Sequence, residues 1–181
     1  MKKLVNLGLL GVGLIGKRHA EIILKSKDAK LAAVADPDPT AEKYAKEIGV
    51  DYFSNLSEML SSSSLDGVII ATPNNLHVEH GIECIQKNIP SLIEKPLAST
   101  AQDAAIISKA SEDSGVPVLV GHHRRYNPII KAAKKIVDSG EIGDVRSFHA
   151  NCWLFKPDEY FEESVWRTKK GAGPVSVNLV H

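Results

Sequence analysis

Three glycines near the N-terminus have the spacing GxGxxG, which is typical of loops that bind a dinucleotide. An apolar run, Val5–Leu10, precedes them, and a helix-like stretch follows them to about Leu24. Backbone N–H groups at the N-terminus of such a helix bind a pyrophosphate. Gly11 permits the tight turn, Gly13 has no Cβ to block the phosphate, and Gly16 lets helix and strand pack closely. The predicted pyrophosphate loop contains Gly11, Gly13, Leu14, Ile15 and Gly16.

An acidic residue follows the second apolar run, where a ribose-binding carboxylate is expected. The run at residues 30–35 ends at Asp36, which lies 36 − 16 = 20 residues after the third glycine. A βαβ unit places there the carboxylate that binds the ribose 2′-hydroxyl, which predicts a nicotinamide or flavin dinucleotide. A 2′-phosphate about 4 Å away would meet repulsion of roughly 1–4 kcal/mol, and Pro37 stands where an arginine could have compensated. NAD is therefore favoured over NADP. A glycine turn in another α/β domain, with Asp36 as a turn residue, is the alternative.

A lysine lies between an acid and a proline at the end of another apolar run, in Glu94-Lys95-Pro96. At a strand end opposite a nicotinamide, Lys95 could donate a hydrogen bond to a substrate hydroxyl and assist its deprotonation. A surface ion pair in a turn is the alternative. Other polar clusters follow the neighbouring apolar runs, at Thr72-Pro73-Asn74 and at residues 122–126.

Apolar runs alternate with helical patterns along the first two thirds of the chain, which predicts an α/β fold with a doubly wound parallel sheet, a Rossmann domain. Functional groups in such sheets gather at the carboxyl ends of the strands. The strands are expected at Val5–Leu10 and at residues 30–35, 66–71, 91–94 and 116–121. Helices are expected from the glycine loop to Leu24 and at Thr40–Ile48, 76–87, 100–114 and 127–138.

Two local signals refine these helices. Asp38 is expected to cap the helix at Thr40–Ile48, with Pro39 at its first position. Asn55 and Glu58 have the capping-box spacing of a short helix ahead of the serine run at residues 61–64, which is interpreted as a solvated loop.

The pattern changes after Gly140. Residues 145–155 alternate between apolar and polar side chains, which predicts a strand with two unlike faces. One strand cannot form a domain. We therefore expect an NAD-binding domain at residues 1–121, then a linker helix and the truncated start of an α+β open-sheet domain at residues 122–181, the chain being the front part of a longer architecture.

Composition limits the possible partners and compartment. A hydrophobic content of 43% over 181 residues is enough for one domain core, and the net charge of +0 suggests no affinity for nucleic acid. The 2 cysteines fit a reducing cytosol better than a disulfide framework. No apolar stretch approaches the ~18 residues of a membrane helix, and no signal peptide precedes the first strand. A cytoplasmic protein that does not contact the membrane is expected.

Several motifs occur together in an order that resembles the Gfo/Idh/MocA oxidoreductases. They are the GxGxxG loop, TPNxxH ending at His77, EKP at Glu94-Lys95-Pro96, HRRYNP ending at Pro128, and WR…GxGPxxxNLxH ending at His181. The resemblance implies an NAD(P)-dependent dehydrogenase of sugars, cyclitols or related polyols. It also implies a second domain with an open antiparallel sheet that binds substrate and often builds a homo-oligomer.

The resemblance also implies roles for single residues. Lys95 matches the catalytic or substrate-orienting lysine, and His181 matches the histidine that accepts the substrate's proton. The residues matching the cofactor-binding positions are Thr72, Pro73, Asn74, His77, Glu94, Lys95 and Arg125. Val177 stands where many members carry an aspartate, and His181 is the last residue. We therefore expect a chain that binds cofactor and turns over poorly, or alternatively a non-catalytic NAD(H)-binding regulatory module.

Two histidine patterns receive structural interpretations. His77, His80 and Cys84 share a helical face, as zinc ligands could, but no fourth ligand is evident and packing on the sheet explains them as well. No metal site is expected. His19, early in the first helix, is expected to be exposed to solvent or to cap locally.

Overall fold

The computed structural model describes residues 3–149, 151, 153, 155–162 and 168. The chain divides into two compact units, Met1–Gly121 and His122–His181.

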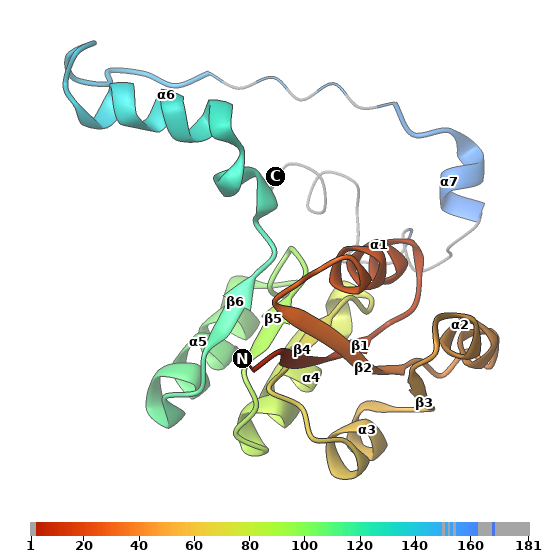
Figure 1. Cartoon of the computed structure of the whole chain (residues 1–181). Coiled ribbons are helices and arrows are strands. Elements are labelled where there is room, and N and C mark those ends of the chain that lie inside the picture. Colours follow the sequence, from red (N-terminus) through yellow and green to blue (C-terminus); the bar gives the residue numbers. More distant parts are fainter. Residues whose placement is uncertain (1–2, 150, 152, 154, 163–167, 169–181) are drawn as a thin grey trace. The chain divides into compact units, whose positions relative to one another are not determined.

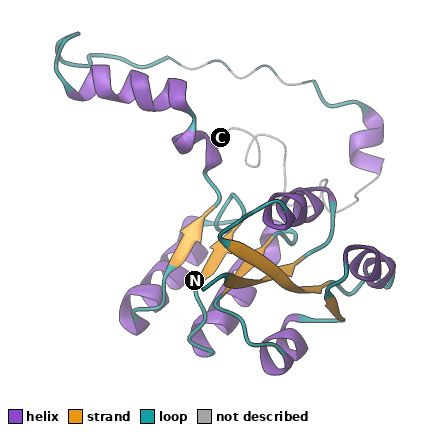
Figure 2. Ribbon diagram, in the orientation of Figure 1, coloured by secondary structure: helices purple, strands orange, loops and turns teal. Residues whose placement is uncertain are grey.

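The first unit is built on a parallel six-stranded sheet (Figures 1 and 2). Its strands are β1 (Val5–Leu10), β2 (Ala29–Ala35), β3 (Asp51–Phe53), β4 (Gly67–Ile70), β5 (Ser91–Ile93) and β6 (Val118–Val120). The order β3-β2-β1-β4-β5-β6 is that of the Rossmann fold, and every neighbouring pair is parallel. The predicted doubly wound sheet is confirmed.

Helices cover both faces of this sheet. Helices α1 (Leu14–Leu24) and α2 (Thr40–Ile48) pack with one apolar cluster, and α3 (Leu56–Ser62), α4 (His77–Gln86) and α5 (Ala101–Ser114) pack with the other. Because neighbouring strand residues point to opposite faces, Leu9 joins the first cluster and Leu10 the second. β4 is buried along its whole length. Strands β1 and β4 are therefore held rigidly at the centre, where the strand order reverses.

Local signals at the helix ends behave mostly as expected. The side chain of Asn55 caps α3 by accepting a hydrogen bond from the Glu58 N–H. The regular part of α2 begins after Pro39, whose backbone is already helical, and the Asp38 carboxylate accepts a hydrogen bond from the Thr40 N–H at 2.9 Å, so Asp38 caps this end through its side chain as predicted. The serine run is also corrected, since its first half belongs to the last turn of α3. The edge strand β3 was not predicted.

The described residues of the second unit contain helical segments only. These are η2 (His123–Tyr126), α6 (Pro128–Asp138) and α7 (Asp158–Glu162), with the side chain of Asn127 capping α6. The strand predicted at residues 145–155 is wrong for the residues described there, which have no regular secondary structure. A strand needs hydrogen bonds from a neighbour, and the described part of this unit offers none. Of the helices among the described residues, none has the length and apolar character that crossing a membrane requires.

Candidate cofactor and active site

The glycine loop joins β1 to α1 with backbone atoms in close contact. A Cβ on Gly16 would lie 1.9 Å from the Gly11 carbonyl oxygen, and one on Gly11 would lie 2.7 Å from the Ala71 carbonyl oxygen. Gly11 also has a φ of 91°, a conformation that other residues rarely adopt. These two glycines therefore let the first turn approach both its own helix and the end of β4.

The middle glycine of the loop differs, because a Cβ on Gly13 would meet nothing within 4 Å. Gly13 is the N-cap of α1, which has neither a side-chain cap nor an acidic residue in its first turn. The adjoining Leu14 and Ile15 side chains are 73% and 41% exposed. The open space in front of the helix N-terminus fits the diphosphate of a dinucleotide, which such N–H groups bind.

Asp36 lies at the end of β2 and also supports the glycine loop. One carboxylate oxygen accepts a hydrogen bond from the Val12 N–H at 2.7 Å, and the other accepts from the Asp38 N–H at 2.9 Å. Its carbonyl oxygen accepts from the Tyr52 hydroxyl at 3.0 Å. Since each carboxylate oxygen can accept a further hydrogen bond, the oriented acid can still receive a ribose hydroxyl.

The loop after β4, with Thr72, Pro73 and Asn74, lies beside the glycine loop at the point where the strand order reverses. Ligands of open parallel sheets bind at that point. Two histidines of α4 hold the loop: His77 Nε2 lies 2.9 Å from the Thr72 carbonyl oxygen, and His80 Nδ1 lies 3.2 Å from the Thr72 hydroxyl.

His77 connects this loop to the turn after β5. Its second ring nitrogen, Nδ1, lies 2.8 Å from the carbonyl oxygen of Pro96, which follows a cis peptide bond. The residue is 1% exposed, and burial lowers its pKa although both carbonyl contacts oppose that shift. Both ring nitrogens face a carbonyl oxygen, so His77 connects the two loops, although a neutral ring has one N–H and donates to one of them. The predicted contact of His77 with a cofactor stays a prediction.

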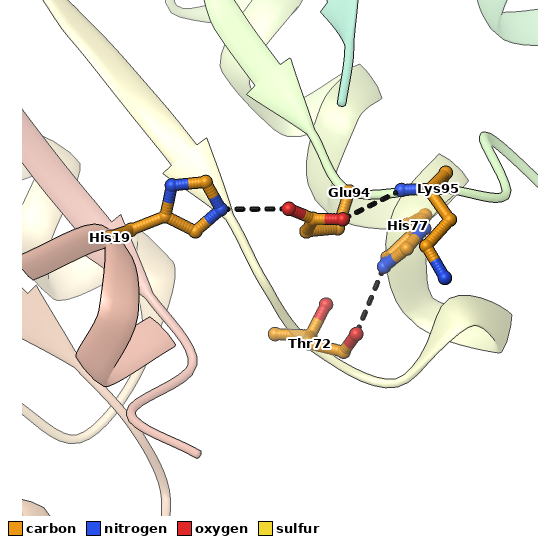
Figure 3. Close-up of polar contacts among 5 residues, drawn as sticks. All are labelled: His19, Thr72, His77, Glu94 and Lys95. Atoms are coloured by element: carbon orange, nitrogen blue, oxygen red, sulfur yellow. Dashed lines mark hydrogen bonds and ion pairs between the residues drawn. The ribbon is translucent and has the colours of Figure 1, made fainter. Parts of the chain in front are cut away.

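The turn after β5 carries the acid and the lysine of the EKP motif (Figure 3). Glu94 contacts His19 of α1 at 2.7 Å and accepts a hydrogen bond from the Lys95 N–H at 3.1 Å. Partial burial alone would raise the pKa of Glu94, but the hydrogen bonds from His19 and Lys95 outweigh it and leave the pKa below its usual value. The expectation that His19 is exposed or caps locally is therefore corrected.

The remaining predicted residues fall elsewhere. Arg125 lies in η2 of the second unit, and His181 lies outside the described residues, so their roles stay predictions.

Cys84 is fully buried in the core, and burial raises the pKa of its thiol to about 12. The thiol therefore serves packing.

The sequence profile of the Gfo/Idh/MocA family, described as "Oxidoreductase family, NAD-binding Rossmann fold", matches residues 5–122. The chain belongs to the Gfo/Idh/MocA oxidoreductase family. The resemblance seen in the motifs is thereby confirmed, and the prediction of an NAD-type cofactor agrees with the description of the family.

Members of the Gfo/Idh/MocA family with similar sequences include an uncharacterized oxidoreductase of Streptococcus pneumoniae, 36% identical over 83% of this chain and 41% of that protein. The scyllo-inositol 2-dehydrogenase (NAD(+)) of Bacillus subtilis is 34% identical over 79% of this chain and 43% of the enzyme. A solved structure, the WlbA dehydrogenase of Bordetella pertussis in complex with NADH and UDP-GlcNAcA, has a TM-score of 0.86 and 30% identity over 91% of this chain and 51% of its own. The chain thus spans about half the length, or less, of these relatives.

Proposed function

We propose that this chain is the NAD-binding part of an oxidoreductase that transfers hydride between a nicotinamide cofactor and a hydroxyl-bearing carbon of a sugar, cyclitol or related polyol. One observation carries the proposal. An uncapped helix N-terminus, an oriented carboxylate and an acid–lysine turn occur at the carboxyl ends of β1, β2 and β5 of a single parallel sheet.

When bound, NAD supplies the hydride chemistry, and the protein supplies binding and orientation. The free N–H groups at the start of α1 hold the diphosphate, with Gly13 leaving room for it. Asp36 accepts a hydrogen bond from the adenosine ribose. Glu94 accepts a hydrogen bond from the second ribose, and the neighbouring Lys95 holds and polarises the substrate hydroxyl. His181 takes the proton of that hydroxyl as general base.

NAD is the proposed cofactor rather than NADP, because Asp36 would repel a 2′-phosphate. The relatives support a sugar or polyol substrate, since one is a scyllo-inositol dehydrogenase and another was solved with a nucleotide-linked sugar acid.

A homo-oligomer formed through the second domain is proposed for the whole protein. A non-catalytic NAD(H)-binding module is the second candidate, which Val177 favours because it can neither take a proton nor bind a hydroxyl.

Fluorescence titration with NADH tests cofactor binding directly. A panel of polyols, followed at the NADH absorbance band, then tests turnover. We expect NADH binding in the wild type, and turnover that is lost in Lys95→Ala while NADH affinity is kept. Lys87→Ala, which removes an exposed lysine after α4, is the matched control and should change neither. Absence of NADH binding would overturn the proposal, and binding without turnover of any polyol would favour the module.

A further inference from the structure

The carboxylate of Glu94 is enclosed by three different elements of the first unit. His19 approaches from α1, the Lys95 N–H from the turn after β5, and Gly121 from the residue after β6. A Cβ on Gly121 would lie 3.2 Å from both the carboxyl carbon and one oxygen of Glu94. The position of the acid is therefore restricted on several sides.

The contact with His19 differs from an ordinary surface ion pair. The side chains of His19 and Glu94 are only 21% and 17% exposed. His19 Nε2 lies 2.7 Å from Glu94 Oε1, although the two residues are 75 positions apart in the sequence. Exposed pairs contribute little because water screens them and both side chains lose freedom. A shielded hydrogen bond to a carboxylate is stronger, because its acceptor carries a charge.

We propose that His19 is a positioning residue for the reaction site, which acts by holding the Glu94 carboxylate in the orientation that receives the nicotinamide ribose. This inference rests on the proposed function, because it deepens the role of that same site. His19 itself need not touch substrate or cofactor.

The chemistry of the pair defines how His19 acts. A carboxylate only accepts, so Nε2 of His19 must carry the hydrogen, which fixes the tautomer of a neutral ring. The bond occupies one lone pair of Oε1, while the Lys95 N–H occupies one of Oε2. Each oxygen keeps a lone pair for a ribose hydroxyl. The Lys95 ammonium also acts on Glu94, and Glu94 in turn raises the pKa of His77 of α4.

NADH titration of His19 variants of the full 181-residue chain provides the first test. His19→Ala should raise the Kd for NADH roughly tenfold, because a hydrogen bond to a charged group is lost. His19→Gln keeps an N–H donor and should recover most of the affinity. His149→Ala, at an exposed position of the second unit, is the control and should bind as the wild type does. Thermal melting confirms that each variant is folded.

A double-mutant cycle separates positioning through Glu94 from a general structural effect. If His19 acts through the acid, His19→Ala should have no further effect on NADH affinity in a Glu94→Ala background. Additive losses would overturn the proposal.

Carbon NMR of the Glu94 carboxyl gives a readout that needs no cofactor. The midpoint of its titration should rise in His19→Ala and return toward the wild-type value in His19→Gln, since the His19 hydrogen bond lowers the pKa of Glu94. An unchanged midpoint together with unchanged NADH affinity would refute the role of His19 alone. Failure of the wild type to bind NADH, with the midpoint still shifted by His19→Ala, would instead refute the proposed function.

Discussion

Val12 donates its backbone N–H to the carboxylate of Asp36 over 2.7 Å, which links the glycine loop after β1 to the acid after β2. The residue proposed to bind the ribose therefore also holds the loop proposed to bind the diphosphate. One substitution should consequently affect both cofactor affinity and cofactor choice.

Asp36→Asn keeps an oxygen for the Val12 N–H but removes the charge. We expect weaker NADH binding, because the ribose acceptor is no longer charged, and relatively better NADPH binding. Removing repulsion of roughly 1–4 kcal/mol should lower the ratio of the NADPH Kd to the NADH Kd at least several-fold. Parallel fluorescence titrations measure both constants, and an unchanged ratio would contradict the assignment of Asp36 to the ribose.

Alanine substitutions at two glycines should separate binding from folding. A Cβ on Gly13 meets nothing within 4 Å, so Gly13→Ala should cost no more than about 1 kcal/mol of stability yet block the diphosphate. A Cβ on Gly16 would collide with the Gly11 carbonyl oxygen, so Gly16→Ala should lower the melting temperature as well as the affinity. Calorimetry with NADH titration distinguishes them, and equal melting temperatures would contradict the loop geometry.

Acid should destabilise the first unit through its α4 histidines. Burial is the main cause that lowers the pKa of both His77 and His80. The unfolded chain therefore binds protons on these rings more readily, so the free energy of unfolding falls as the pH drops through about 6.5. Thermal melts between about pH 7.5 and 5.5 should show a falling midpoint.

His80→Gln should make that fall shallower, because the substitution removes one of the two rings whose pKa is lowered by burial. His149→Gln replaces an exposed histidine and serves as its matched control. A pH dependence identical in wild type and His80→Gln would show that His80 does not contribute.

Cys84 should resist thiol reagents in the folded protein. Its side chain is fully buried, and a pKa of about 12 leaves almost no thiolate, which is the reactive form. In a Cys152→Ser variant, where Cys84 is the remaining cysteine, labelling should be slow in buffer and rapid in denaturant. Fast labelling without denaturant would contradict the position of Cys84 in the core.

The fold could be predicted to the extent that local patterns determine it. Strands β1, β2, β4, β5 and β6 lie within the predicted ranges or one residue beyond them, because buried parallel strands form continuous apolar runs. Strand β3 has only three residues, Asp51–Phe53, and forms by pairing with β2 at the sheet edge. Such a short segment has no pattern of its own. The strand predicted at residues 145–155 is absent from the described residues of that range for the opposite reason, since alternation alone provides no partner.

The site was predictable where one motif contains its own chemistry. The glycine loop and Asp36 are examples, because the spacing in one βαβ unit brings them together. The roles of His19 and His77 depend on partners in other elements, at Glu94 and Pro96. The signal that could have found His19 is its place on α1, on the side facing the ends of the neighbouring strands.

Helix α1 begins at the glycine loop and carries His19, so one helix connects the proposed diphosphate site to the acid after β5. The six steps from Gly13 to His19 rise about 9 Å along the helix axis, so α1 fixes the separation between the two ends of the proposed site. Adding one residue between Gly16 and His19 would turn the imidazole by about 100° and uncouple the two ends without changing the glycine turn.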